Sequence, residues 1–122
     1  MDKKEIFLKL KKLLSPYGRF LKVIKSSENV YELFTAKKAV IGKKVFERMF
    51  FASIVIRGGF VGFYFFPVYT HKSRFKTLPV RLKKCLKGKS CFHIKELDME
   101  LERQIKDIVK KGFLLYKKAG WV

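Results

Sequence analysis

The spacing of apolar residues near the N-terminus predicts an amphipathic helix over residues 3–14. Asp2 and Glu5 have the three-residue spacing of a capping box, and the segment Ser15–Gly18 contains the proline and glycine that end the pattern. We expect the helix to pack its apolar stripe against the rest of the chain rather than lie on a membrane. The stripe consists of Ile6, Phe7, Leu10, Leu13, Leu14 and Tyr17.

The middle of the chain is rich in β-branched and aromatic residues and predicts a series of strands. Because Gly58-Gly59 can supply the positive φ angles of a tight turn, we expect the strands on either side of it to form an antiparallel hairpin. The expected strands are Phe20–Ile24, Tyr31–Ile41, Val45–Ile56, Phe60–Phe66 and Ser90–Lys95.

Both faces of this predicted hairpin are apolar. Phe63 and Phe65 alternate with Tyr64 and Phe66, so neither set of alternate positions is polar. An antiparallel sheet with one solvated face would have a polar residue at every second position. We therefore expect helices to cover one face of the sheet, and a pocket or a second copy of the chain to cover the other.

Two helices are predicted in the C-terminal part. Thr77 can cap a short helix that Gly88 ends, and Asp98 can cap a long helix that Gly120-Trp121 ends. Gly112 lies on the apolar stripe of the long helix, where we expect it to allow a close approach to the sheet. The other stripe residues are Leu101, Ile105, Ile108, Val109 and Tyr116.

These patterns together predict an α+β fold formed by one domain, residues 1–122. We expect an antiparallel sheet of about five strands, N- and C-terminal helices and one short inserted helix. The longest nearly apolar run, Met49–Ile56, is far shorter than the ~20 residues of a membrane-spanning helix. The N-terminus also lacks the pattern of a secretory signal. We expect a soluble cytosolic protein with Cys85 and Cys91 reduced.

The charge is strongly unbalanced. The chain has 29 lysines and arginines against 10 acidic residues, a net charge of +19. Residues 1–90 hold 22 of these cations and 5 of the acids, which predicts a positive potential concentrated on one side. Most of the cations are lysines, and these favour diffuse contacts with phosphate over base-specific ones. An alternative is that the excess lysine only keeps the protein soluble.

No motif predicts catalysis or a cofactor. The spacing of Cys85, Cys91 and His93 fits no closed zinc site, with or without His71. The sequence places no residue to orient the His93 imidazole beside Cys91. Neither of the glycine-rich phosphate-binding patterns, GxxxxGK(S/T) and GxGxxG, is present. We therefore expect a protein that is not an enzyme and holds no metal or other cofactor.

The segment from His71 to Ser90 combines many cations with an aromatic residue and predicts an anion-binding site. Gly88 can let neighbouring side chains and backbone N–H groups surround a phosphate-like group. A solvated loop and helix face is the alternative. The candidate ligand-binding residues of this segment are Lys72, Arg74, Lys76, Lys84, Lys87, Gly88, Lys89 and Ser90.

From Phe50 to Val122 the sequence resembles the YdhG-like domains of unknown function. Three segments carry this resemblance: Phe51–Ile56, Gly62–Tyr69 and Leu86–Ile94. The resemblance implies a small cytosolic α+β domain with helices flanking the sheet. One branch of the family is described as frataxin-like, which implies a role in intracellular iron handling. The resemblance also implies a pocket near the aromatic hairpin, formed by Tyr64, Lys87, Gly88 and Lys89.

The sequence thus favours a non-catalytic anion-binding module for a nucleic acid or a phosphorylated ligand. The first alternative is the iron chaperone that the family resemblance implies, although the excess positive charge opposes iron binding. The second alternative is a homodimeric interaction protein that uses the second apolar face of the sheet.

Overall fold

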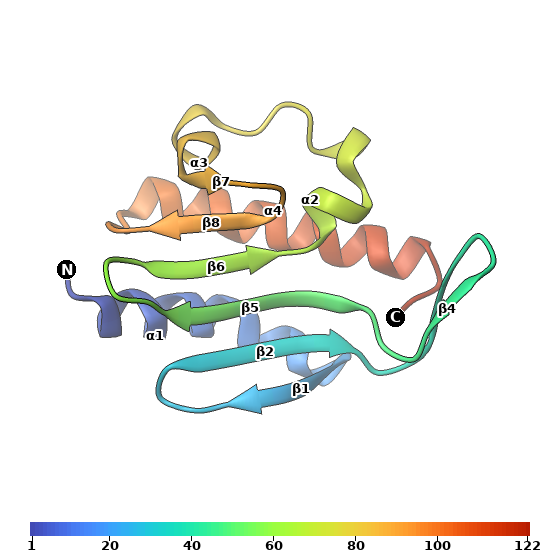
Figure 1. Ribbon diagram of the computed structural model, residues 1–122. Coiled ribbons are helices and arrows are strands. Elements are labelled where there is room, and N and C mark those ends of the chain that lie inside the picture. The colour runs from blue at the N-terminus through green and yellow to red at the C-terminus, as the bar shows by residue number, and fades with distance from the viewer.

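The computed structural model describes residues 1–122 and has the predicted α+β architecture (Figure 1). Six strands form an antiparallel sheet in the order β1-β2-β5-β6-β8-β7, and β3 and β4 form a separate hairpin. The elements are α1 (Lys3–Leu14), η1 (Ser15–Arg19), β1 (Leu21–Ser26), β2 (Val30–Thr35), β3 (Ala39–Ile41), β4 (Lys44–Phe46), β5 (Phe50–Ile56), β6 (Val61–Phe65), α2 (Pro67–Thr70), η2 (Lys72–Arg74), α3 (Val80–Cys85), β7 (Leu86–Lys87), β8 (Cys91–Ile94) and α4 (Met99–Lys118).

The two long helices begin at the residues that the sequence predicts. The Asp2 carboxylate accepts a hydrogen bond from the Glu5 N–H at 2.8 Å and caps α1. The Asp98 carboxylate accepts one from the Leu101 N–H at 2.9 Å and caps α4. At the other end of α4, Gly120 has a φ of +83° and releases the chain from the helix, as expected.

Two predicted strands are each divided in the structure. The expected strand Tyr31–Ile41 ends at Thr35 and resumes as β3, because the buried Thr35 turns the chain out of the sheet. Its hydroxyl donates to the Lys37 carbonyl and accepts from the Met49 N–H, both at 2.8 Å. The expected strand Val45–Ile56 is likewise divided into β4 and β5, and the β3–β4 hairpin projects from the sheet (Figure 1).

The β5–β6 hairpin is confirmed, but its turn differs from the prediction. Ile56 pairs with Val61, and neither glycine of Gly58-Gly59 has a positive φ. The Arg57 N–H donates to the Phe60 carbonyl at 2.9 Å. The Nζ of Lys3, from α1, donates to the carbonyls of Arg57 and Gly58 at 3.1 and 2.7 Å, so the turn is tied to the N-terminal helix.

The short inserted helix is also shifted from its predicted position. It begins after Pro79 rather than after Thr77, and it ends before Gly88. Gly88 instead lies between β7 and β8 with a φ of +76°, where it forms the turn of a short hairpin. With only two residues, β7 is too short to give a periodic pattern, which explains why the sequence predicts a sheet of about five strands and the main sheet has six.

One core of 28 buried residues lies between the sheet and the helices α1 and α4. Ile54, Phe63 and Phe92 are cross-strand neighbours in β5, β6 and β8, and all three are fully buried in this layer. Both helices lie behind the same face of the sheet (Figure 1). Helices therefore cover one of the two apolar faces, as expected, and leave the other face without a helix.

Aromatic rings enclose His71 near the end of α4. Its ring lies 5.4 Å from that of Trp121 and 5.8 Å from that of Tyr116, measured between centroids. Its Nδ1 lies 2.9 Å from the hydroxyl of Thr70. Burial, with a smaller effect of the nearby Arg74 charge, lowers the pKa of His71 below its ordinary value.

We expect the stability of the fold to decrease as the pH falls below about 6.5. Because the pKa of His71 is lower in the folded chain, the unfolded chain takes up the imidazole proton at a higher pH than the folded chain does. The neutral His71 therefore makes its full contribution to the free energy of unfolding above about pH 6.5, and this contribution is lost as the pH falls below that value. Urea unfolding between about pH 7 and pH 5 measures the effect. A His71→Phe protein keeps the ring and should lose this part of the pH dependence, whereas an unchanged dependence would contradict the assignment.

Candidate anion-binding site

A cavity of about 350 Å³ lies between the α2–η2 segment and the β7–β8 turn. Five apolar or aromatic side chains form its wall, and the buried Val68 and Phe75 belong to the core. Three lysines lie around it, Lys72 and Lys76 from one segment and Lys89 from the β7–β8 turn. The lining residues are Val68, Tyr69, Lys72, Phe75, Lys76, Leu78, Leu86, Gly88 and Lys89.

Local sequence features explain how the cavity forms. Pro67 begins α2 directly after β6, which suits a proline because the first turn of a helix needs no N–H donor there. The chain then turns over the sheet, and the ring of Phe75 packs edge-on against Phe65 at a centroid distance of 6.1 Å. On the opposite side, the positive φ of Gly88 reverses the chain. This places the Nζ of Lys89 at 5.5 Å from the centroid of the Tyr69 ring.

The cavity brings together four of the predicted ligand-binding residues, Lys72, Lys76, Gly88 and Lys89. It does not include the other five. Lys84 and Lys87 line a separate depression beside Cys85 and His93, and Arg74 lines a third beside α4. Tyr64 lies in the sheet with its hydroxyl bonded to Arg57, and the Ser90 carbonyl accepts from the Phe65 N–H.

The sequence did not identify the apolar half of the cavity. Tyr69, Leu78 and Leu86 each contribute to it from a different segment, and they share no periodicity that would group them. The one available signal was Phe75, an aromatic residue within a run of lysines and arginines. Its burial indicates that this segment packs on the core instead of extending into solvent.

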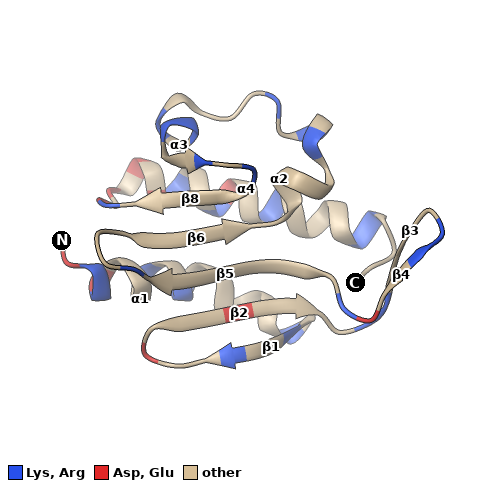
Figure 2. Ribbon diagram, in the orientation of Figure 1, with Lys and Arg blue, Asp and Glu red and all other residues tan.

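The positive charge is not confined to one side of the molecule. Lysines and arginines lie on α1, α3, α4, β1 and the β3–β4 hairpin (Figure 2), so the predicted concentration on one side is wrong. Among all lysines and arginines, only Lys38 and Arg81 pair with a carboxylate. The three lysines of the cavity therefore carry charges that no acidic side chain neutralises.

The two cysteines are free and partly buried. Burial raises the pKa of both thiols, and this outweighs the lowering by nearby cations and, for Cys91, by the Tyr64 hydroxyl, so both stay protonated near neutral pH. The imidazole of His93 is stacked on the ring of Phe60, with the centroids 3.8 Å apart. No group of three or more His, Cys, Asp or Glu side chains is placed to hold a metal ion.

No family model, curated protein or solved structure matches this chain. The resemblance to the YdhG-like domains thus stays a prediction from the sequence. Within the structure, none of the helices combines the length and the apolar character needed to cross a bilayer.

Proposed function

We propose that this protein is a non-catalytic anion-binding module whose ligand combines a phosphate group with an apolar or aromatic body. The observation that carries the proposal is the cavity beside Gly88, with an apolar wall on one side and three unpaired lysines around it. An apolar wall excludes water from the body of a ligand, and lysine is a common point-charge partner for phosphate. No carboxylate, imidazole or thiol lines the cavity, which favours binding over acid–base or nucleophilic chemistry.

The size of the cavity favours a small ligand or one terminal group of a larger one. Its volume of about 350 Å³ is near the lower end of the range for small-molecule sites. A mononucleotide has the required chemistry, because its base suits the apolar wall and its phosphate suits the lysines. We expect the protein to act in the cytosol, where Cys85 and Cys91 remain reduced.

Of the two alternatives, the iron chaperone has less physical support. Iron favours clustered oxygen, nitrogen or sulfur donors, and the only acidic residue within the six-stranded sheet is Glu32. The homodimer alternative would bring together two chains of +19 each, which repel each other at low salt.

The proposal predicts saturable binding of adenosine monophosphate, measured by isothermal titration calorimetry. We expect adenosine, which lacks the phosphate, to bind at least about tenfold more weakly, because it loses the charge-assisted contacts. Replacing two lysines of the cavity, in a Lys72→Ala/Lys76→Ala protein, should weaken binding of the nucleotide by a similar factor.

A Lys43→Ala/Lys44→Ala protein is the matched control. It loses the same charge from the exposed β3–β4 hairpin and leaves the cavity intact. Equal loss of affinity in both double variants would show that the nucleotide responds to net charge alone. Such a result, or the absence of any binding by the wild-type protein, would overturn the proposal for this cavity.

A further inference from the structure

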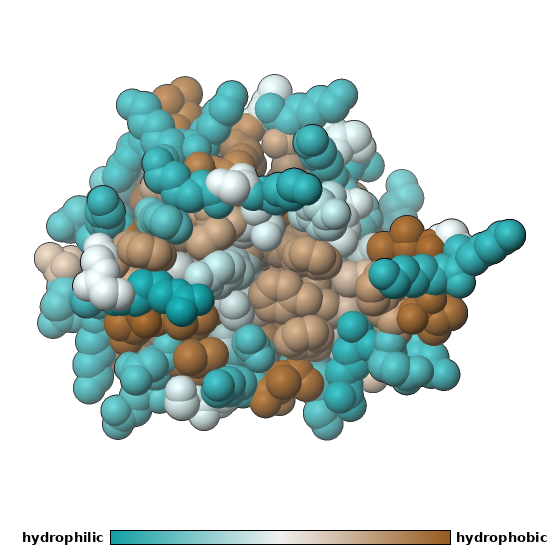
Figure 3. Space-filling model, viewed as in Figure 1, coloured by the Kyte–Doolittle hydropathy of each residue, from teal (hydrophilic) through white to brown (hydrophobic).

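The face of the sheet opposite α1 and α4 has no helix over it (Figure 1). Figure 3 shows apolar side chains gathered in the middle of this open face, with hydrophilic side chains around them. Phe34, Phe50 and Phe66 are only partly buried here, although the neighbouring residues Leu33, Phe51 and Phe65 are in the core.

The aromatic side chains of this face form a continuous line from β2 across β5 to Phe66, the residue that follows β6. The ring of Phe34 lies 5.2 Å from that of Phe50, and the ring of Phe50 lies 5.5 Å from that of Phe66. The ring of Phe66 lies 5.3 Å from that of Tyr69, which is 48% exposed. A second aromatic group is formed by Phe60, the residue before β6, which is stacked on His93 of β8.

The backbone holds this line of rings in place. The pairing of β2 with β5 contains a bulge, because Leu33 pairs with Ala52 while Phe34 pairs with Phe50. The bulge keeps Phe50 opposite Phe34 and leaves the extra residue, Phe51, buried in the core. The hydroxyl of Tyr116, from α4, donates to the Phe50 carbonyl at 2.7 Å and anchors the strand from behind.

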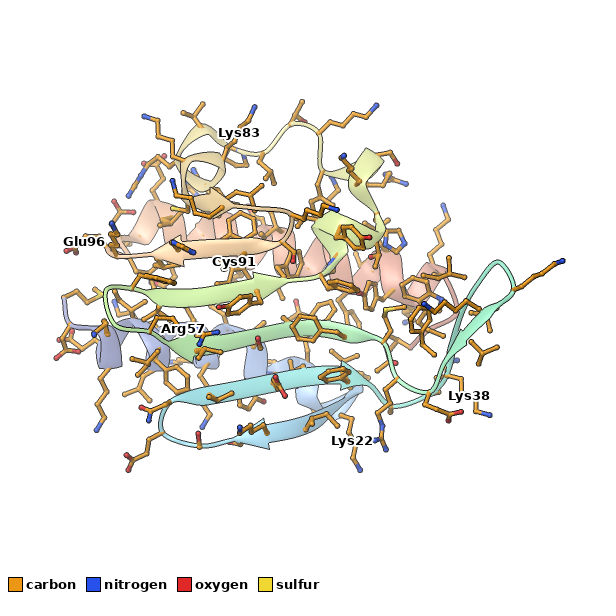
Figure 4. The ribbon with its side chains drawn as sticks, viewed as in Figure 1. Lys22, Lys38, Arg57, Lys83, Cys91 and Glu96 are labelled. Atoms are coloured by element: carbon orange, nitrogen blue, oxygen red, sulfur yellow. The ribbon has the colours of Figure 1, made fainter.

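Cations border the aromatic line. Lys22 is exposed and is the cross-strand partner of Phe34. Arg57 donates to the Tyr64 hydroxyl at 2.7 Å and extends over the sheet from the end of β5 (Figure 4). At the other border, the Nζ of Lys89 lies over the ring of Tyr69.

We propose that the open face binds single-stranded nucleic acid. Flat aromatic side chains can stack on unpaired bases of any sequence, and lysines along the border can contact the phosphates. A duplex hides its base faces in the stack and exposes only base edges, sugars and phosphates, so the aromatic line would have no base face to stack on. A second copy of the chain would bring together cations of the same kind, because each border carries lysine or arginine.

This site lies beside the proposed nucleotide cavity, but most of its residues differ. Only Tyr69 and Lys89 border both, while Phe34, Phe50 and Cys91 belong to the open face alone. Either site can therefore fail its own test without deciding the other.

Cys91 provides a direct reporter for the open face. It is the cross-strand partner of Tyr64, and since Phe92 and Ile94 point into the core, Cys91 points to the opposite side. A Cys85→Ser protein leaves it as the only thiol. The experiment measures the rate at which a maleimide modifies Cys91 with and without a DNA single strand of about 12 nucleotides, a typical site size for such surfaces.

At a strand concentration about ten times the Kd, we expect the modification of Cys91 to slow about tenfold, because only the free protein reacts. An equal concentration of duplex should protect Cys91 much less. In a Cys91→Ser protein, where Cys85 is the only thiol, the single strand should leave the rate unchanged.

Three results would overturn the proposal. The first is no protection of Cys91 by the single strand. The second is equal protection by the single strand and the duplex, which indicates contact with phosphates alone. The third is protection that rises with protein concentration in the absence of DNA, which indicates that a second copy covers the face.

Discussion

A Phe34→Ala/Phe50→Ala protein is expected to bind single-stranded DNA at least about thirtyfold more weakly than the wild type. Each contact between a base and an aromatic side chain contributes about 1–3 kcal/mol, so the loss of two such contacts costs at least about 2 kcal/mol. The two rings adjoin each other at 5.2 Å, and both lie in the middle of the aromatic line. Fluorescence anisotropy with a labelled strand measures the change.

The same variant should remain folded. Both rings are only partly buried on the open face, and the hydrogen bond from Tyr116 goes to the backbone of Phe50, which the substitution does not alter. Circular dichroism and a thermal unfolding curve check this. The expected loss of affinity therefore does not depend on loss of structure.

A Leu8→Ala/Val80→Ala protein is the matched control for this prediction. These residues are 53% and 70% exposed, and they lie on α1 and α3, away from the open face. Removing two exposed apolar side chains there should change the affinity by less than about twofold, since they contact no base. A similar loss of affinity in both double variants would mean that the aromatic line is not the binding surface.

The two long helices, α1 and α4, were predictable because their signals are local. The carboxylates of Asp2 and Asp98 cap helices within three residues of their own position, and the apolar stripes of both helices are continuous. The break at Thr35 was not predictable, because the buried hydroxyl bonds to Met49, fourteen residues away. Residues 31–41 contain the polar pair Lys37-Lys38, but nothing local to the segment shows that the strand ends at Thr35.

The sequence also predicted that both faces of the sheet are apolar, but not which of them is covered. The covered face is the one on which α1 and α4 both pack, and no pattern within the strands indicates which face that is. The residues of the cavity were likewise predictable only in part. The lysines around Gly88 could be recognised as a group, whereas Tyr69 and Leu86 join them only through the tertiary fold.

A Gly112→Ala protein is expected to be less stable than the wild type by about 1–2 kcal/mol. A Cβ at this position of α4 would lie 2.5 Å from Cζ of Phe65 and 2.8 Å from Cγ of Pro67, closer than atoms can pack. Inserting a methyl group into a packed core costs about 1–3 kcal/mol, and these short contacts place the cost in the upper half of that range. Subtracting the gain of about 1 kcal/mol from the better helix propensity of alanine leaves a net loss of about 1–2 kcal/mol. Urea unfolding followed by circular dichroism measures the difference.

Gly58→Ala supplies the control for this substitution, because it makes the same chemical change where there is space. Nothing lies within 4 Å of a Cβ at Gly58, and its φ is not positive. We expect this protein to differ from the wild type by less than about 0.5 kcal/mol. Equal stability of the Gly58→Ala and Gly112→Ala proteins would mean that the contact between α4 and the sheet is looser than the structure indicates.

The substitution at Gly112 should also change the shape of the nucleotide cavity. Pro67, which the new methyl group would contact, is the first residue of α2, and α2 carries Val68 and Tyr69 to the cavity wall. Relief of the contact requires α4 to move away from the sheet or α2 to shift with Pro67. We therefore expect Gly112→Ala to weaken the binding of adenosine monophosphate as well as the fold, and Gly58→Ala to leave both unchanged.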